Sequence, residues 1–218
     1  MNLPSILQTI SIAAIPMLFA ITLHEVAHGL AARFFGDRTA EAQGRLSLNP
    51  LKHVDPVGTI AVPAVLLLLG SPFLFGWAKP VPVNARYFRR PRLDMGWVAA
   101  AGPAANLAMA LAWALVGAAA GAGYAGAGPA GAWFAQMGRV GVFFNVLLAV
   151  FNMLPIPPLD GGRVLVSVLP RGPALMLARV EPYGFLIVLA LVAIPGLLSM
   201  LLGPTVRFLM NSIARLVS

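Results

Sequence analysis

Long apolar runs separated by short polar and basic stretches dominate this chain. The clearest runs fall at residues 5–35, 95–120, 140–154 and 182–202. Several of them approach the roughly 20 residues that an α-helix needs to cross the hydrocarbon core of a bilayer. The pattern therefore predicts an all-α polytopic membrane protein with about four transmembrane helices.

A further apolar run, residues 57–75, is interrupted by Pro63, Gly70 and Pro72. Both of its flanks are rich in Lys and Arg, an excess that marks cytoplasmic loops. A full crossing would place one basic flank outside, so we expect a re-entrant hairpin bent at Pro63 or Gly70. Irregular backbone at that depth is tolerated where it lines a wet cavity. An ordinary transmembrane helix of 19 residues is the alternative.

The two polar segments beside this run predict a small membrane-associated β element. Residues 45–48 alternate between polar and apolar side chains, and Asn49-Pro50 marks a turn. Residues 76–83 have an extended pattern with two prolines. A strand edge here would offer a substrate backbone hydrogen-bonding partners.

The outer connections follow from composition. Residues 121–131 are Gly- and Ala-rich without charge, which predicts a short external loop. Residues 206–217 predict an amphipathic tail at the outer surface. With the hairpin, both termini lie outside. We interpret residues 1–218 as a single domain, with a core at 5–165 and a C-terminal helix and tail at 180–218.

Composition supports a membrane environment. Of the 218 residues 59% are hydrophobic and 10% are charged, against about 25% charged in soluble domains. The formal charge of +8 fits contact with anionic headgroups of the lipid bilayer, not with nucleic acid, because the arginines lie between apolar runs. The chain has no Cys, so it has no disulfide framework and no thiolate nucleophile or ligand.

The first apolar run ends in a metal-binding pattern. His24-Glu25-Val26-Ala27-His28 is an HExxH motif. Residues four apart share one helix face, so both imidazoles can bind one zinc ion while the intervening Glu acts as a general base. Arg33 follows His28 by five residues, which places His28 about 7 Å from an interfacial charge.

A zinc hydrolase needs a third protein ligand. The unused candidates are His and acidic residues, namely Asp37, Glu41, His53, Asp55, Asp94, Asp160 and Glu181. Most lie in basic loops, and we expect His53 to be a solvated loop histidine. Asp160 is preferred because it lies at the inner end of an apolar span, after three prolines and before two glycines, where an isolated carboxylate is costly. A helix cap paired with Arg163 is the alternative for Asp160.

Two asparagines are candidate substrate-binding residues. Asn152 lies about two helical turns before Asp160, and its amide could hold a substrate backbone or polarise its carbonyl. Asn106 lies in Gly102-Pro103-Ala104-Ala105-Asn106. An interhelical hydrogen bond is the alternative for both.

These motifs resemble the site-2 protease family of intramembrane zinc metalloproteases. The family pattern is HExxH followed by N-x-x-P-x-P-x-L-D-G, and residues 152–162 read Asn-Met-Leu-Pro-Ile-Pro-Pro-Leu-Asp-Gly-Gly. Pro158 makes the proline run denser than that pattern. The segments Gly102-Pro103-x-x-Asn106, Asn49-Pro50-Leu51 and Gly76-Trp77-Ala78-Lys79-Pro80 resemble the small bacterial members without a PDZ domain.

The resemblance covers about residues 10–163, most of the chain. It implies one Zn²⁺ per chain held by His24, His28 and Asp160, with Glu25 as general base. It also implies a multi-pass protein of the bacterial inner membrane whose active site opens toward the cytoplasm.

The expected function is intramembrane cleavage of single-span or signal-peptide-like substrates, as in regulated intramembrane proteolysis. We expect no sensor domain in the chain. Three alternatives remain. One is an inactive homologue that binds membrane partners as a scaffold, and another is a metal transporter, which would want polar residues along its path. The third is a membrane zincin that uses Glu181 as its late ligand.

Overall fold

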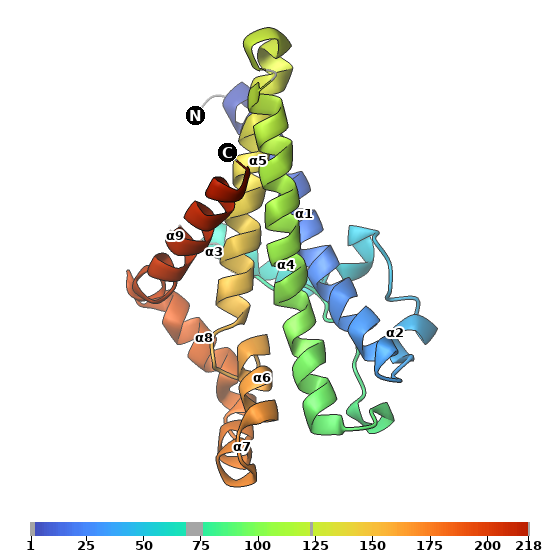
Figure 1. The fold of residues 1–218 in the computed structure, drawn as a ribbon. Coiled ribbons are helices and arrows are strands. Elements are labelled where there is room, and N and C mark those ends of the chain that lie inside the picture. Colours follow the sequence, from blue (N-terminus) through green and yellow to red (C-terminus); the bar gives the residue numbers. More distant parts are fainter. Residues whose placement is uncertain (1–2, 69–75, 123, 218) are drawn as a thin grey trace.

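The computed structural model describes residues 3–68, 76–122 and 124–217, and these residues fold into helices (Figure 1). The long helices are α1 (Leu3–Phe34), α4 (Pro91–Ala122), α5 (Tyr124–Asn152) and α9 (Leu197–Val217). The shorter ones are α2 (Thr39–Ala42), α3 (Val62–Leu68), α6 (Asp160–Val168), α7 (Arg171–Ala178) and α8 (Gly184–Ala193). Single turns lie at Pro50–His53, Pro56–Ala61, Ala85–Tyr87 and Glu181–Tyr183.

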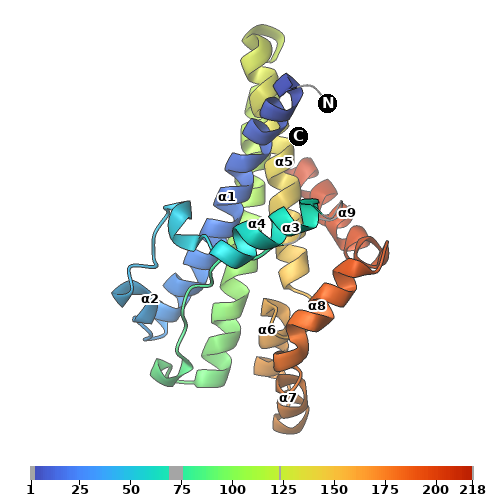
Figure 2. The same ribbon diagram turned by 180° about the vertical axis from the view of Figure 1, so that it is seen from behind.

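Helices α1, α4 and α5 form the centre of the molecule (Figures 1 and 2). Helices α4 and α5 approach closely because small residues face each other. A Cβ atom on Gly138 would lie only 2.6 Å from the Cα atom of Gly117, so glycine is required there. Helix α9 closes one side by packing Leu202, Val206 and Ile213 against α4 and α5.

The predicted polytopic, helical character is confirmed. Five stretches among the described residues are long and apolar enough to cross a membrane: Gln8–Phe34, Pro91–Gly121, Gly128–Asn152, Arg171–Ala193 and Leu197–Val217. The predicted external loop at 121–131 is largely wrong. Helix α5 already begins at Tyr124, and its one non-helical residue is Gly128, with φ of 57°. Alanines between the glycines favour helix over loop.

The C-terminal boundary is also corrected. We predicted a span at 182–202 and a separate tail at 206–217. Helix α8 instead ends at Ala193, Gly196 takes a φ of 80°, and α9 runs unbroken to Val217. Pro195 and Gly196 cannot continue α8, whereas the apolar stripe of α9 continues across the predicted boundary. Together α8 and α9 return the chain to the end where both termini lie (Figures 1 and 2).

The polar segments around residues 57–75 are joined to each other, but no strand is present in the part of the chain that the structure describes. The backbone N–H of Trp77 donates to Gly58 O at 3.1 Å, and that of Lys79 donates to His53 O at 2.9 Å. The predicted β element is therefore not found there, since residues 45–49 and 76–84 are irregular. The predicted bend at Gly70 lies outside the described residues.

His53 differs from its prediction. It is 3% exposed rather than solvated, and its Nε2 lies 2.9 Å from Ser47 O. The Arg45 guanidinium also donates to Lys79 O at 2.9 Å. Turn hydrogen bonds therefore fold residues 45–53 inward against the 77–80 segment, which buries the imidazole.

Asp37 locks the end of α1 to the segment that leads into α4. It is fully buried and accepts hydrogen bonds from the backbone N–H of Asn84 at 2.6 Å and of Thr39 at 2.9 Å, and from the Thr39 hydroxyl. Burial alone would raise the pKa of Asp37, but these three donors favour the carboxylate and hold the pKa below its usual value.

We expect Asp37→Asn to destabilise the protein by about 1–3 kcal/mol, because the amide places a donor where three donors already converge. Thermal unfolding in detergent measures the difference. Since the pKa of Asp37 is lowered in the folded state, its contribution is complete above the unfolded pKa of about 4 and is lost as the pH falls through the folded value. The gap between wild type and variant should therefore narrow below about pH 4; a gap independent of pH would contradict this account.

Candidate metal centre

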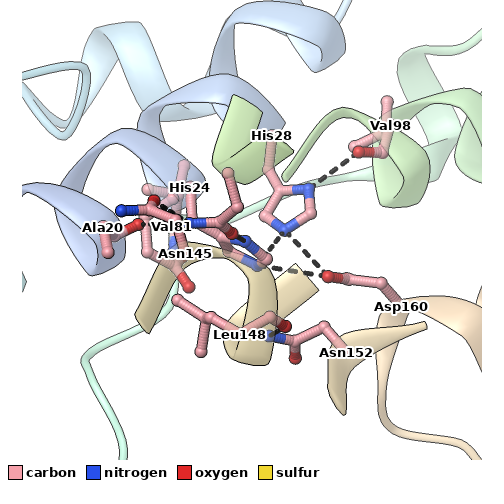
Figure 3. A network of polar contacts seen from close by, with 11 residues as sticks. Ala20, His24, His28, Val81, Val98, Asn145, Leu148, Asn152 and Asp160 are labelled. Carbon is pink, nitrogen blue, oxygen red and sulfur yellow. Dashed lines mark hydrogen bonds and ion pairs between the residues drawn. The ribbon is translucent and has the colours of Figure 1, made fainter. Parts of the chain in front are cut away.

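Two imidazoles from α1 and one carboxylate from α6 meet at a single point (Figure 3). The Nε2 atoms of His24 and His28 lie 3.0 Å apart. Asp160 Oδ2 lies 3.1 Å from His24 Nε2 and 3.4 Å from His28 Nε2. The HExxH spacing places both rings on one face of α1, and the helix start at Asp160 brings in the third group.

The outer nitrogens of both rings are already bonded. His28 Nδ1 lies 2.7 Å from the backbone oxygen of Val98, and His24 Nδ1 lies 2.5 Å from Asn106 Oδ1. Both partners are oxygen acceptors, so each Nδ1 carries the hydrogen. The Nε2 atom of each ring is then the one available to a metal ion, and it faces the other ring and Asp160. Metal-binding histidines have this arrangement.

Three potential ligand atoms that converge in this way could hold one cation. Asp160 is 9% exposed, and its Oδ2 has no hydrogen-bond donor. Ligand atoms around a tetrahedral zinc ion lie about 3.4 Å from one another, close to the three observed separations. Two imidazoles and one carboxylate are also a donor set typical of catalytic zinc. The residues present therefore fit a zinc ion.

The backbone around Asp160 is shaped by its prolines and glycines. Pro155, Pro157 and Pro158 end regular helix after α5. Gly161 and Gly162 lie directly against the backbone of Met153, Leu154 and Pro157, where added Cβ atoms would overlap it. Glycine at both positions thus lets α6 begin close beneath the end of α5 and directs Asp160 toward α1.

The alternative partners of Asp160 are engaged elsewhere. Arg163 Nη2 lies 3.2 Å from Glu181 Oε1, on a partly exposed surface. Neither of the two alternatives, an Asp160–Arg163 pair and a Glu181 ligand, is observed. The other acidic candidates make contacts outside the site. Asp37, Asp55 and Asp94 accept hydrogen bonds from backbone N–H groups, and Glu41 forms an ion pair with Arg33.

Glu25 is held by a residue that the sequence did not indicate. Its Oε2 accepts a hydrogen bond from the backbone N–H of Val81 at 2.7 Å. Val81 lies in the irregular 76–84 segment, which reaches α1 at this point (Figure 3). The general-base candidate is therefore oriented by a main-chain donor 56 residues away.

Gly102 is the second residue that was missed. A Cβ atom there would lie 2.5 Å from His28 Nε2 and 2.7 Å from His24 Cε1. Any side chain at this position would collide with both rings. The Gly102-Pro103-x-x-Asn106 pattern was the available signal, but a glycine in a membrane helix is equally explained by helix packing.

The two asparagines differ from each other. Asn106 is fully buried; its Oδ1 faces His24 and its Nδ2 donates to Ala20 O and to Asn145 Oδ1. The interhelical alternative is thus what the structure shows for Asn106. Asn152 donates to Leu148 O, one turn back in its own helix. A substrate-binding role for Asn152 stays a prediction.

Comparisons with known proteins indicate a family of zinc metalloproteases. A family model described as Peptidase family M50 matches residues 129–195. "Putative zinc metalloprotease YwhC" of Bacillus subtilis (strain 168) is 39% identical over 205 residues, which cover 94% of this chain and 90% of the relative. "Putative zinc metalloprotease Rip2" of Mycolicibacterium smegmatis is 35% identical over 180 residues, which cover 83% of this chain and 66% of the relative. No solved structure gives a significant match.

We expect Asp160→Ala to lose zinc and Glu181→Ala to keep it, because only Asp160 faces both imidazoles. The measurement is zinc per chain after purification in detergent, followed by competition with a chelator. The wild type should hold one zinc ion, and the affinity of the Asp160 variant should fall by more than about 100-fold, since removal of a direct ligand costs more than removal of its supporting partner. The opposite pattern would make Glu181 the ligand.

Proposed function

Because the chain belongs to peptidase family M50, we propose that it is an intramembrane zinc metalloendopeptidase that hydrolyses peptide bonds in or near transmembrane segments of other proteins. The observation that carries this proposal is the convergence of His24, His28 and Asp160 beside Glu25, with both histidines and Glu25 on a helix that is apolar enough to cross a membrane.

Each residue of the site has a role in that reaction. His24, His28 and Asp160 would hold the zinc ion, which when bound polarises the scissile carbonyl and lowers the pKa of water. Glu25 takes a proton from the attacking water as the oxygen of that water bonds to the carbonyl carbon. As the C–N bond breaks, Glu25 passes the proton to the departing amine. The Val81 N–H keeps one Glu25 oxygen fixed, which leaves the other to accept the proton.

The arginine distribution supports a cytoplasmic opening in a bacterial inner membrane. Arginines gather at the end of the molecule formed by α2, α7 and the start of α4, namely Arg33, Arg38, Arg89, Arg90, Arg92, Arg163, Arg171 and Arg179. By the positive-inside rule this end faces the cytoplasm. His28 lies only five residues before Arg33, so the site would be reached from that side.

Two backbone hydrogen bonds support the re-entrant course of residues 57–75. Trp77 N–H donates to Gly58 O and Lys79 N–H donates to His53 O, so both ends of the run lie side by side. A helix that crossed the bilayer would separate its ends by about 30 Å. We infer that the run enters and leaves the membrane on one side, and accessibility labelling of a cysteine introduced at Ser71 would contradict this if it reacted from the opposite side.

The proposed substrates are single-span membrane proteins or signal-peptide remnants. A helical substrate hides its carbonyls in hydrogen bonds and must unwind before hydrolysis. We propose that an unwound segment pairs with the irregular backbone of residues 45–48 or 77–83. The second of these segments contacts Glu25 through the N–H group of Val81. Unchanged cleavage after proline substitutions at residues 46 and 48 would contradict pairing with the first segment.

We expect Glu25→Gln to retain one zinc ion and to lose cleavage of single-span model substrates by at least about 100-fold, because the amide cannot accept the water proton. Purified wild type and variant in lipid are compared for zinc content and for product. Retained zinc with no cleavage by either protein, across a broad substrate panel, would favour the alternative of an inactive homologue that holds membrane partners.

Val81→Pro tests the orientation of Glu25. Proline removes the N–H donor, so we expect cleavage to fall about tenfold or more while zinc content stays the same, in line with the loss of one charge-assisted hydrogen bond. Val81→Ala keeps the N–H group and is the matched control. Equal losses in the two variants would assign the effect to the valine side chain instead.

A further inference from the structure

A buried row of side chains connects the candidate metal ligand His24 on α1 to Asn145 on α5. Asn106 on α4 lies between them and is bonded to both, at 2.5 Å and 3.0 Å. Asn106 and Asn145 are fully buried and His24 is 6% exposed. In the view of Figure 3, Asn145 and Asp160 lie on opposite sides of the His24 ring. No family motif described above includes Asn145.

The direction of every bond in this row is fixed by two backbone carbonyls. Asn145 Nδ2 lies 2.9 Å from Gly141 O, and a carbonyl can only accept, so the amide nitrogen of Asn145 must face it. The Oδ1 atom of Asn145 is then turned toward Asn106. Ala20 O, 3.0 Å from Asn106 Nδ2, is likewise only an acceptor.

These two acceptors leave Asn106 a single orientation. Both hydrogens of its Nδ2 are used, one on Ala20 O and one on Asn145 Oδ1. Its Oδ1 must therefore face His24 Nδ1, which obliges that nitrogen to carry the hydrogen. The Nε2 lone pair of His24 then points at His28 and Asp160.

We infer that Asn145 is a positioning residue: it fixes the orientation of the Asn106 amide and, through it, the tautomer and ring direction of His24. This inference rests on the proposed role of His24 as a metal ligand. His28 does not need such a row, because the backbone oxygen of Val98 fixes it directly. Of the two histidines, only His24 therefore depends on other side chains for its tautomer and ring direction.

A purely structural role explains Asn145 less well. A leucine has the same number of side-chain heavy atoms and would avoid the cost of burying an amide in an apolar span. The Nδ2 bond to Gly141 O lies within α5 and holds no other helix. Only the Oδ1 atom reaches another helix, and what it touches is the partner of His24.

The test compares wild type with Asn145→Leu, which keeps the number and branching of the side-chain heavy atoms and removes the acceptor. Because the chain contains three histidines, a long-range ¹H–¹⁵N spectrum of metal-free, ¹⁵N-histidine-labelled protein in detergent resolves each ring. We expect His24 to be protonated at Nδ1 in wild type and to become a mixture of tautomers in the variant. His53, whose Nε2 contacts Ser47 O and not this row, is the internal control and should be unchanged.

Zinc affinity, measured by chelator competition, is the second readout. We expect Asn145→Leu to weaken it about 10–100-fold, as for other partners that support a metal ligand. Asn145→Ala repeats both measurements with a smaller side chain in case leucine prevents folding. An unchanged His24 tautomer together with zinc affinity within twofold of wild type in the folded variant would overturn the inference. Wild-type protein that binds no zinc would instead contradict the proposed function, and the spectrum of the metal-free protein would still test the row itself.

Discussion

The rest of this structure depends on one constraint: His24, His28 and Asp160 must direct their ligand atoms at a single point in an apolar interior. The outer nitrogens of His24 and His28 face oxygen acceptors, so their inner nitrogens face Asp160, whose Oδ2 has no hydrogen-bond partner among the described residues. A zinc ion would satisfy all three groups at once. The buried surroundings of the site would strengthen these electrostatic contacts.

The fold is organised to present that point accurately. Helix α1 supplies two groups by its own periodicity, whereas Asp160 must come from a distant part of the sequence. Glycines permit the approach on both sides: Gly102 admits the rings to the surface of α4, and Gly161 with Gly162 lets α6 start against the end of α5. A side chain at any of these three positions would block the approach, so the glycines are as necessary as the candidate ligands.

Much of the fold and of the candidate metal centre could be predicted from the sequence, because the motifs that indicate them are local. The HExxH motif fixes a face of one helix, and prolines followed by glycines fix an opening in the chain at Asp160. Main-chain partners were not predictable, since every residue except proline has a backbone N–H group such as that of Val81, and every residue has a backbone oxygen such as that of Val98. Helix boundaries near the C-terminus failed for a different reason. The stripe of Leu202, Val206 and Ile213 packs continuously, and tertiary packing outweighed the local change in polarity around Arg207.

The hydrogen bond from Val81 to Glu25 also has a consequence during synthesis of the protein. Synthesis proceeds from the N-terminus, so the helix with the HExxH motif enters the membrane long before residues 81 and 160 exist. Until then Glu25 lacks the N–H group of Val81, and the two imidazoles lack the Asp160 carboxylate. A partly made chain therefore displays the motif without the groups that complete the candidate site. The full arrangement exists only once α6 has been made and has packed against α4.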